Sequence, residues 1–186
     1  MLTSVQKRKL STQFNLLDAD GNGLLEEADF LRIAHELARA QGLQDEARAT
    51  LEQRYRHLWD SLAAACDTDG DGRVTIQEWL DRHDALMQED CTRRVSEPGY
   101  RSPFESTARF FFDLLDANSD GRLSRSEYRA FCAAHGLPGE VADQAYDRVV
   151  APGSSLLREE LVDMVLEFYF GDEQTTGTWL FGPLES

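Results

Sequence analysis

The feature that most constrains this chain is the twelve-residue stretch from Asp67 to Glu78. It matches the pattern D-x-[DN]-x-[DN]-G-x5-E at every specified position. In such a loop the side chains at positions one, three and five converge on one point, and the glutamate at position twelve folds back with two oxygens. A hard cation that takes six to eight oxygen ligands fits this arrangement, which predicts a calcium site.

The same pattern recurs from Asp116 to Glu127, with an asparagine at position three. The loops beginning at Asp18, Asp67 and Asp116 are equally spaced along the chain, which indicates an internal repeat rather than coincidence. In both complete loops the arginine at position seven is expected to contribute its main-chain carbonyl. The ligands predicted for these loops are Asp67, Asp69, Asp71, Arg73 and Glu78, and Asp116, Asn118, Asp120, Arg122 and Glu127.

The first copy, residues 18–29, keeps the polar side chains of positions one, three and five but ends on aspartate. Because aspartate is one methylene shorter than glutamate, we expect it to offer one oxygen or to bind through water, which brings coordination towards the six ligands that magnesium prefers. Glu26 at position nine could offset this loss by coordinating directly, and the alternative is a structural turn. The ligands predicted here are Asp18, Asp20, Asn22, the carbonyl of Leu24, Glu26 and Asp29.

A fourth unit is expected because loops of this kind pair through a short β-bridge, and an unpaired loop leaves an open strand edge. Residues 149–160 give the best register, with Leu156 at the bridge position and Glu160 at position twelve. No carboxylate occupies positions one, three or five of this loop. We therefore expect it to pack without binding calcium, with Leu156 bridging to Leu123 as Val74 bridges to the first loop.

Apolar residues recur at spacings of three and four around the loops, which is the periodicity of amphipathic helices. The sequence therefore predicts an all-α fold of four helix–loop–helix units in two paired lobes, packed into a compact globule with short β-bridges between paired loops. The helix after the second loop is expected to begin at Trp79. Residues 96–103 contain Pro and Gly and form a linker. The N-terminal pair is assigned to residues 1–95 and the C-terminal pair to residues 104–186.

The chain is acidic, with 19 Lys and Arg against 34 Asp and Glu and a net charge of −15. This charge argues against nucleic acid and anionic membranes as partners and favours metal cations. The alternative interpretation is that the charge serves only to keep the protein soluble. No segment approaches the eighteen apolar residues of a transmembrane helix. The three cysteines are scattered without C-x-x-C spacing, which favours reduced thiols. We expect a cytoplasmic monomer.

Other chemically suggestive residues have ordinary interpretations. The histidines follow no metal-ligand spacing and are assigned to packing or surface roles, and Trp59 and Trp79 are assigned to the core. The sequence contains no Gly-rich phosphate loop and no nucleophile–base motif, so we expect no enzyme. The four histidines are His35, His57, His83 and His135.

The C-terminal stretch, residues 171–186, carries several large apolar side chains within a short polar tail. Such side chains are costly to leave in water, so we expect the stretch to dock as a plug in a hydrophobic cleft. A frayed tail and a partner-binding segment are the alternatives. The apolar residues are Trp179, Leu180, Phe181 and Leu184.

The chain resembles the sarcoplasmic calcium-binding protein family and is most similar to its bacterial members of the calerythrin type. The features that carry this resemblance are the loops, the long spacing between the first two, the degenerate fourth unit and the ending Trp179–Leu184. The resemblance covers nearly the whole chain. It implies four EF-hand units in two pairs that pack together, and a role in calcium buffering or transport. Relatives often bind through loops one, three and four or a similar subset, whereas here loops two and three match the pattern completely.

The function expected is an intracellular calcium buffer or store without enzymatic activity. Two carboxylates held ~5 Å apart at an effective dielectric constant near 20 repel by roughly 3 kcal/mol, and a divalent ion reverses this repulsion. Binding should therefore stabilise the folded chain. The alternative is a calcium sensor that opens a groove for a target helix. Adaptable grooves favour methionine, and this chain has only Met1, Met87 and Met164.

Overall fold

The computed structural model describes residues 1–171, and its elements confirm the all-α class. Within this range the helices are α1 (Ser4–Leu17), α2 (Glu27–Ala40), α3 (Asp45–Cys66), α4 (Ile76–Ser96), α5 (Pro103–Leu115), α6 (Arg125–Ala134), α7 (Gly139–Val149) and α8 (Arg158–Phe170). The short strands are β1 (Leu24–Leu25), β2 (Val74–Thr75), β3 (Arg122–Leu123) and β4 (Leu156–Leu157). No described helix is long and apolar enough to cross a membrane.

The helices that leave loops two and three begin with a reciprocal cap. At the start of α4, the Thr75 hydroxyl accepts from the Glu78 main-chain N–H, and the Glu78 carboxylate accepts from the Thr75 main-chain N–H. This capping box satisfies two N–H groups that have no partner within the helix. The cap places the start of α4 at Ile76, three residues before the Trp79 start expected from the apolar periodicity. Ser124 and Glu127 start α6 in the same way.

The β-bridges lie where the sequence predicts them. β1 pairs with β2 and places Leu25 opposite Val74, while β3 pairs with β4 and places Leu123 opposite Leu156. All four of these side chains are fully buried. The two antiparallel bridges join loops one and two and loops three and four, so each pair of units closes its own strand edges.

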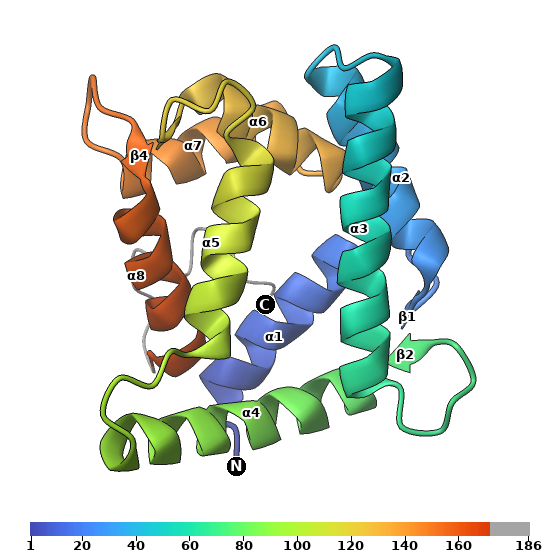
Figure 1. The fold of residues 1–186 in the computed structure, drawn as a ribbon, viewed down its shortest axis with the longest axis vertical. Coiled ribbons are helices and arrows are strands. Elements are labelled where there is room, and N and C mark those ends of the chain that lie inside the picture. The colour runs from blue at the N-terminus through green and yellow to red at the C-terminus, as the bar shows by residue number, and fades with distance from the viewer. Residues whose placement is uncertain (172–186) are drawn as a thin grey trace.

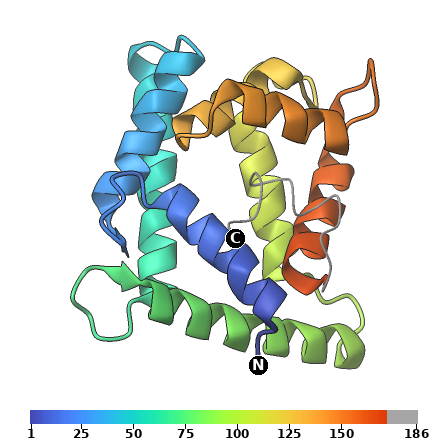
Figure 2. The ribbon, with the colours of Figure 1, turned by 180° about the vertical axis from the view of Figure 1, so that it is seen from behind.

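Figure 1 shows α3 and α8 on opposite sides of the molecule with α5 between them, α4 along one end, and α6 and α7 along the other. Seen from behind, α1 crosses the molecule obliquely between these helices (Figure 2). Contacts between α2 and α6 join the first pair of units to the second, and α1 packs against both α4 and α8. The two pairs are therefore in extensive contact.

A single connected cluster of buried side chains runs through both pairs. Trp59 and Trp79 belong to it, which confirms their assignment to the core. Four apolar side chains of α8 are also buried in the second pair: Leu161, Met164, Val165 and Phe168. The predicted plug cannot be placed, since residues 172–186 lie outside the described part of the chain.

Two of the histidines are core residues. His83 and His135 are 7% and 8% exposed, and each Nδ1 lies near the main-chain carbonyl one helical turn earlier, at 2.8 Å from Trp79 and 2.9 Å from Phe131. Burial lowers the pKa of both imidazoles from 6.5 to about 4. Each ring is therefore neutral at pH 7, with Nδ1 donating its proton to the carbonyl oxygen.

This burial predicts an acid-sensitive fold. Between pH 6.5 and 4 the unfolded chain binds protons that the folded histidines do not, so the free energy of unfolding falls as the pH drops through this window. In calcium-free protein, His83→Asn and His135→Asn should each flatten the pH dependence of urea unfolding between pH 4 and 6.5. Asparagine keeps a donor close to the position of Nδ1. The exposed His57→Asn is the matched control, and an equal flattening in that variant would contradict the prediction.

Candidate metal centres

The shape of the second loop is fixed by hydrogen bonds from its own main-chain N–H groups to its carboxylates. Asp67, which caps the end of α3, accepts from the N–H groups of Gly70 at 2.7 Å and Gly72 at 3.0 Å. Gly72, at position six, has a φ of +82°, a conformation that favours glycine. Asp69 and Asp71 each accept from the N–H two residues further along. These bonds direct three carboxylates to one point, with an oxygen of each within 4.8 Å of the others.

Glu78 closes this loop with both of its carboxylate oxygens. Its Oε1 accepts from the main-chain N–H and the hydroxyl of Thr68, both at 2.9 Å, and its Oε2 accepts from the N–H of Thr75 at 2.9 Å. The main-chain donors of Thr75 and Thr68 are the chief reasons that the pKa of Glu78 is lowered to about 2. The carboxylate is therefore ionised throughout the neutral range and ready to bind a cation.

The third loop repeats this geometry. Asp116 accepts from the N–H groups of Asp120 at 3.1 Å and Gly121 at 2.9 Å. The Glu127 carboxylate spans the loop as Glu78 does, accepting from the N–H groups of Ala117 at 3.1 Å and Ser124 at 2.9 Å. Hydrogen bonds thus hold Asp116 and Glu127 in place across loop three, while loop two also gathers three carboxylates within 4.8 Å of one another. The full ligand sets of both loops stay predictions.

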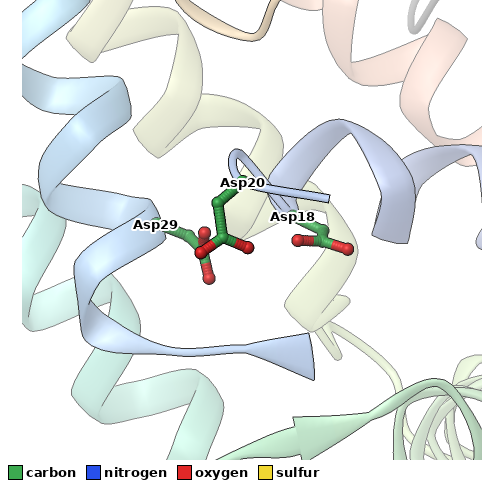
Figure 3. A group of neighbouring side chains, drawn as sticks. All are labelled: Asp18, Asp20 and Asp29. Atoms are coloured by element: carbon green, nitrogen blue, oxygen red, sulfur yellow. The ribbon is translucent and has the colours of Figure 1, made fainter. Parts of the chain in front are cut away.

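The first loop gathers Asp18, Asp20 and Asp29, whose carboxylates face a common space (Figure 3) and lie within 4.8 Å of one another. Asp29 is only 1% exposed. Its Oδ2 accepts from the Glu26 N–H at 2.9 Å, while its buried Oδ1 has no hydrogen-bond partner within the described residues. Burial, and to a smaller extent the charges of Asp20 and Asp18, raises the pKa of Asp29. A cation in this space would supply the missing partner of Oδ1 and offset the repulsion.

Glu26 takes part in a contact between the loops that the sequence does not indicate. Its Oε1 lies 2.8 Å from Nε of Arg73, the residue at position seven of loop two. Because Leu24 and Leu25 pair with Thr75 and Val74, the two loops lie side by side and bring this acid and base together. Coordination of a cation by Glu26 remains a proposal, and it would compete with the ion pair.

The fourth loop retains the cap without the metal ligands. Glu160 accepts from the Leu157 N–H at 2.8 Å, the same bond that Glu78 and Glu127 make in their loops. The sequence supplies no carboxylate at positions one, three or five of this loop. Its structural features are thus the cap and the β-bridge.

The donor sets of loops one to three fit a hard divalent cation, because they consist of carboxylate, amide and carbonyl oxygens. A bound ion would neutralise carboxylates that repel one another, and the loop hydrogen bonds already hold these groups near their binding positions. Leu24, Arg73 and Arg122 lie at position seven of the loops, where the main-chain carbonyl is the expected ligand. Thr68 is a supporting residue that the motif misses, because its hydroxyl contact to Glu78 depends on the closed loop.

Removing the position-twelve carboxylate tests each loop separately. Because Glu78 and Glu127 each offer two oxygens, Glu78→Gln and Glu127→Gln should each lower the number of tight calcium sites by one in isothermal titration calorimetry. The matched control is Glu160→Gln, which changes the same cap position in the loop without metal ligands. A lost site in the Glu160 variant, or an unchanged site number in the other two, would contradict this assignment.

Comparison with known proteins agrees with this geometry. Residues 7–82 match the family model described as an EF-hand domain pair, and residues 109–132 match the EF hand model. Calerythrin from Saccharopolyspora erythraea is 29% identical over 174 residues, covering 92% of this chain and 96% of that protein. The sarcoplasmic calcium-binding protein alpha chain from Penaeus vannamei is 29% identical over 182 residues, covering 91% of each.

Among solved structures, the calcium-loaded apo form of the coelenterazine-binding protein from Renilla muelleri superposes with a TM-score of 0.76 at 22% identity, covering 98% of this chain and 100% of that chain. At this identity the likeness establishes the fold alone. The curated relatives are calcium-binding proteins rather than enzymes, in agreement with the expectation from the sequence. The chain therefore matches EF-hand models in two separate stretches, and the curated proteins to which it is similar over most of its length are calerythrin and the sarcoplasmic calcium-binding proteins.

Proposed function

We propose that the protein is a calcium buffer or store that binds through loops two and three and more weakly through loop one. The observation that carries this proposal is the single core shared by both EF-hand pairs. Apolar faces that are already packed against each other are not available for a target helix. Met87 and Met164, which could line an adaptable groove, are 6% and 7% exposed.

Loop one is the site with the weaker calcium binding in this proposal. Asp29 is buried and its pKa is raised, chiefly by burial, so protons compete with calcium here more than at Glu78. The short side chain also lowers the number of oxygens that the loop can offer, and magnesium tolerates six ligands. We therefore assign to loop one a calcium site at which magnesium competes with calcium.

The remaining expectations complete the proposal. The protein acts as a cytoplasmic monomer, with the EF-hand pairs at residues 1–95 and 104–186 joined by the linker 96–103. The Pro103 start of α5 and the Ser96 end of α4 support this boundary. A calcium sensor is the second candidate. It is favoured by Leu58 and Leu62 on α3, which are only partly buried and leave some apolar surface near the domain boundary.

One titration separates buffer from sensor. Chelator-stripped protein is titrated with calcium by calorimetry, with and without millimolar magnesium, while 8-anilinonaphthalene-1-sulfonate fluorescence reports exposed apolar surface. A buffer should show two or three sites, a higher thermal midpoint with calcium, and little new dye binding. A large reversible rise in dye fluorescence with calcium would instead establish the sensor.

Asp29→Glu tests the assignment of loop one. Glutamate at position twelve can bind with two oxygens, so calcium affinity at this loop should rise on the order of tenfold and competition by magnesium should weaken. Asp29→Asn, which removes the charge while keeping the length, should weaken calcium binding. If calorimetry finds the same number of sites and the same magnesium competition in the natural protein and both variants, loop one is a structural turn.

A further inference from the structure

A cavity of about 220 Å³ is lined by residues of α1, α3, α4, α5 and α6 and so lies between the two EF-hand pairs. Its walls are mainly apolar, with Leu58 and Leu62 on one side and Phe104 and Phe111 on the other. Leu58, Leu62 and Phe111 are only partly buried, so the cavity reaches the surface beside α3 and α5. A ligand can therefore enter without unfolding a helix.

The volume limits the size of a ligand. An apolar protein cavity of about 150 Å³ is large enough to hold benzene, so this space accommodates a larger, two-ring molecule. Trp79 and Tyr169 contribute aromatic surface to the walls, in addition to Phe104 and Phe111. Aromatic side chains favour offset or edge contacts with other rings, which suits a flat aromatic body.

Arg82 supplies the charge that distinguishes this cavity from a packing defect. It lines the cavity, and its buried Nε has no hydrogen-bond partner in the described part of the chain. Among residues 1–171 the guanidinium forms no ion pair, although the chain carries a net charge of −15. An acidic group on a ligand would supply both the missing acceptor and the missing ion-pair partner of Arg82, because arginine binds carboxylates through paired N–H donors.

Arg82 also lies where two hollows meet. A second pocket shares Arg82, Leu86 and Pro103 with the first and contains Tyr100 and Arg101 as well. Arg93 in this second pocket is paired with Glu89 and Glu97 and is therefore already neutralised. The apolar body of a ligand would lie in the first pocket and its acidic group at the junction.

The two buried histidines restrict the charge of the ligand. His83 and His135 line the cavity, and burial keeps both imidazoles neutral at pH 7. With each Nδ1 donating to a carbonyl, each Nε2 carries a lone pair and can only accept a hydrogen bond. Within this cavity Arg82 is thus the cationic group for an anion, and a second acidic group on the ligand would have no cationic partner there.

From these contacts we infer that the cavity binds a flat, two-ring aromatic molecule bearing one acidic group, with its rings between α3 and α5 and its acidic group on Arg82. This site is separate from the metal loops and does not depend on the buffer role. The chain's own segment 172–186 offers related chemistry, since its sequence includes Trp179 and the acidic Glu185. The experiment therefore includes that occupant as one of its outcomes.

The test uses the full chain, saturated with calcium, and two probes of matched shape. 2-Naphthoate carries the acid, and 2-naphthalenemethanol is its neutral counterpart. Arg82→Met should weaken naphthoate binding by about tenfold or more, because a hydrogen-bonded charge contact is lost, and leave the alcohol within about twofold. Arg54→Met, which removes an exposed arginine from α3, is the charge-matched control and should change neither affinity.

Cavity filling provides the second test. Ala65 lines the space from α3, and Ala65→Leu should weaken both probes together, since it occupies volume without changing charge. Circular dichroism and an unchanged calcium stoichiometry show that each variant is folded.

Three results would overturn the inference. The first is no naphthoate binding by the full chain at millimolar concentration. The second is equal weakening by Arg54→Met and Arg82→Met. The third is binding that appears only when the chain is truncated after Gly171, which would assign the cavity to the chain's own segment 172–186.

Discussion

The rest of the structure depends on one type of hydrogen bond, which recurs at the start of each helix that follows a loop. A carboxylate at the third helical position accepts from the main-chain N–H of the N-cap residue, at 2.8 to 2.9 Å in all four loops. In three of the loops this carboxylate occupies loop position twelve of a cation-binding motif. The bond therefore both starts the helix and holds the loop closed around the place where an ion would lie. The start of the helix and the geometry of the site therefore share one contact.

The fourth loop shows which of these roles can be separated. It keeps the cap at Glu160 and the β-bridge of Leu156 but lacks the carboxylates that would bind an ion. Its bridge buries Leu123 of the third loop and closes that loop's strand edge. A loop without metal ligands therefore supports the geometry of its partner, and the pair, rather than the single loop, is the structural unit.

Loop motifs and helical periodicity, which are properties of short stretches of the chain, were sufficient to predict the β-bridges at Val74 and Leu156 and the helical class. The three metal-ligand sets rest on the same motifs and stay predictions. The Glu26–Arg73 ion pair, the burial of His83 and the cavity depend on how helices from distant segments pack, and no short motif encodes that packing. The start of α4 shows the same limit on a small scale, because the cap at Thr75 rather than apolar periodicity determines it.

The cavity and the metal loops are joined through single peptide bonds. Phe30 and Trp79 line the cavity and directly follow Asp29 and Glu78, the last residues of loops one and two. Any occupant whose affinity differs between the calcium-free and calcium-loaded forms must change the affinity for calcium by the same factor, because linkage between two binding equilibria is reciprocal. An occupant of that kind would thus help to set the free calcium concentration at which the loops become half saturated.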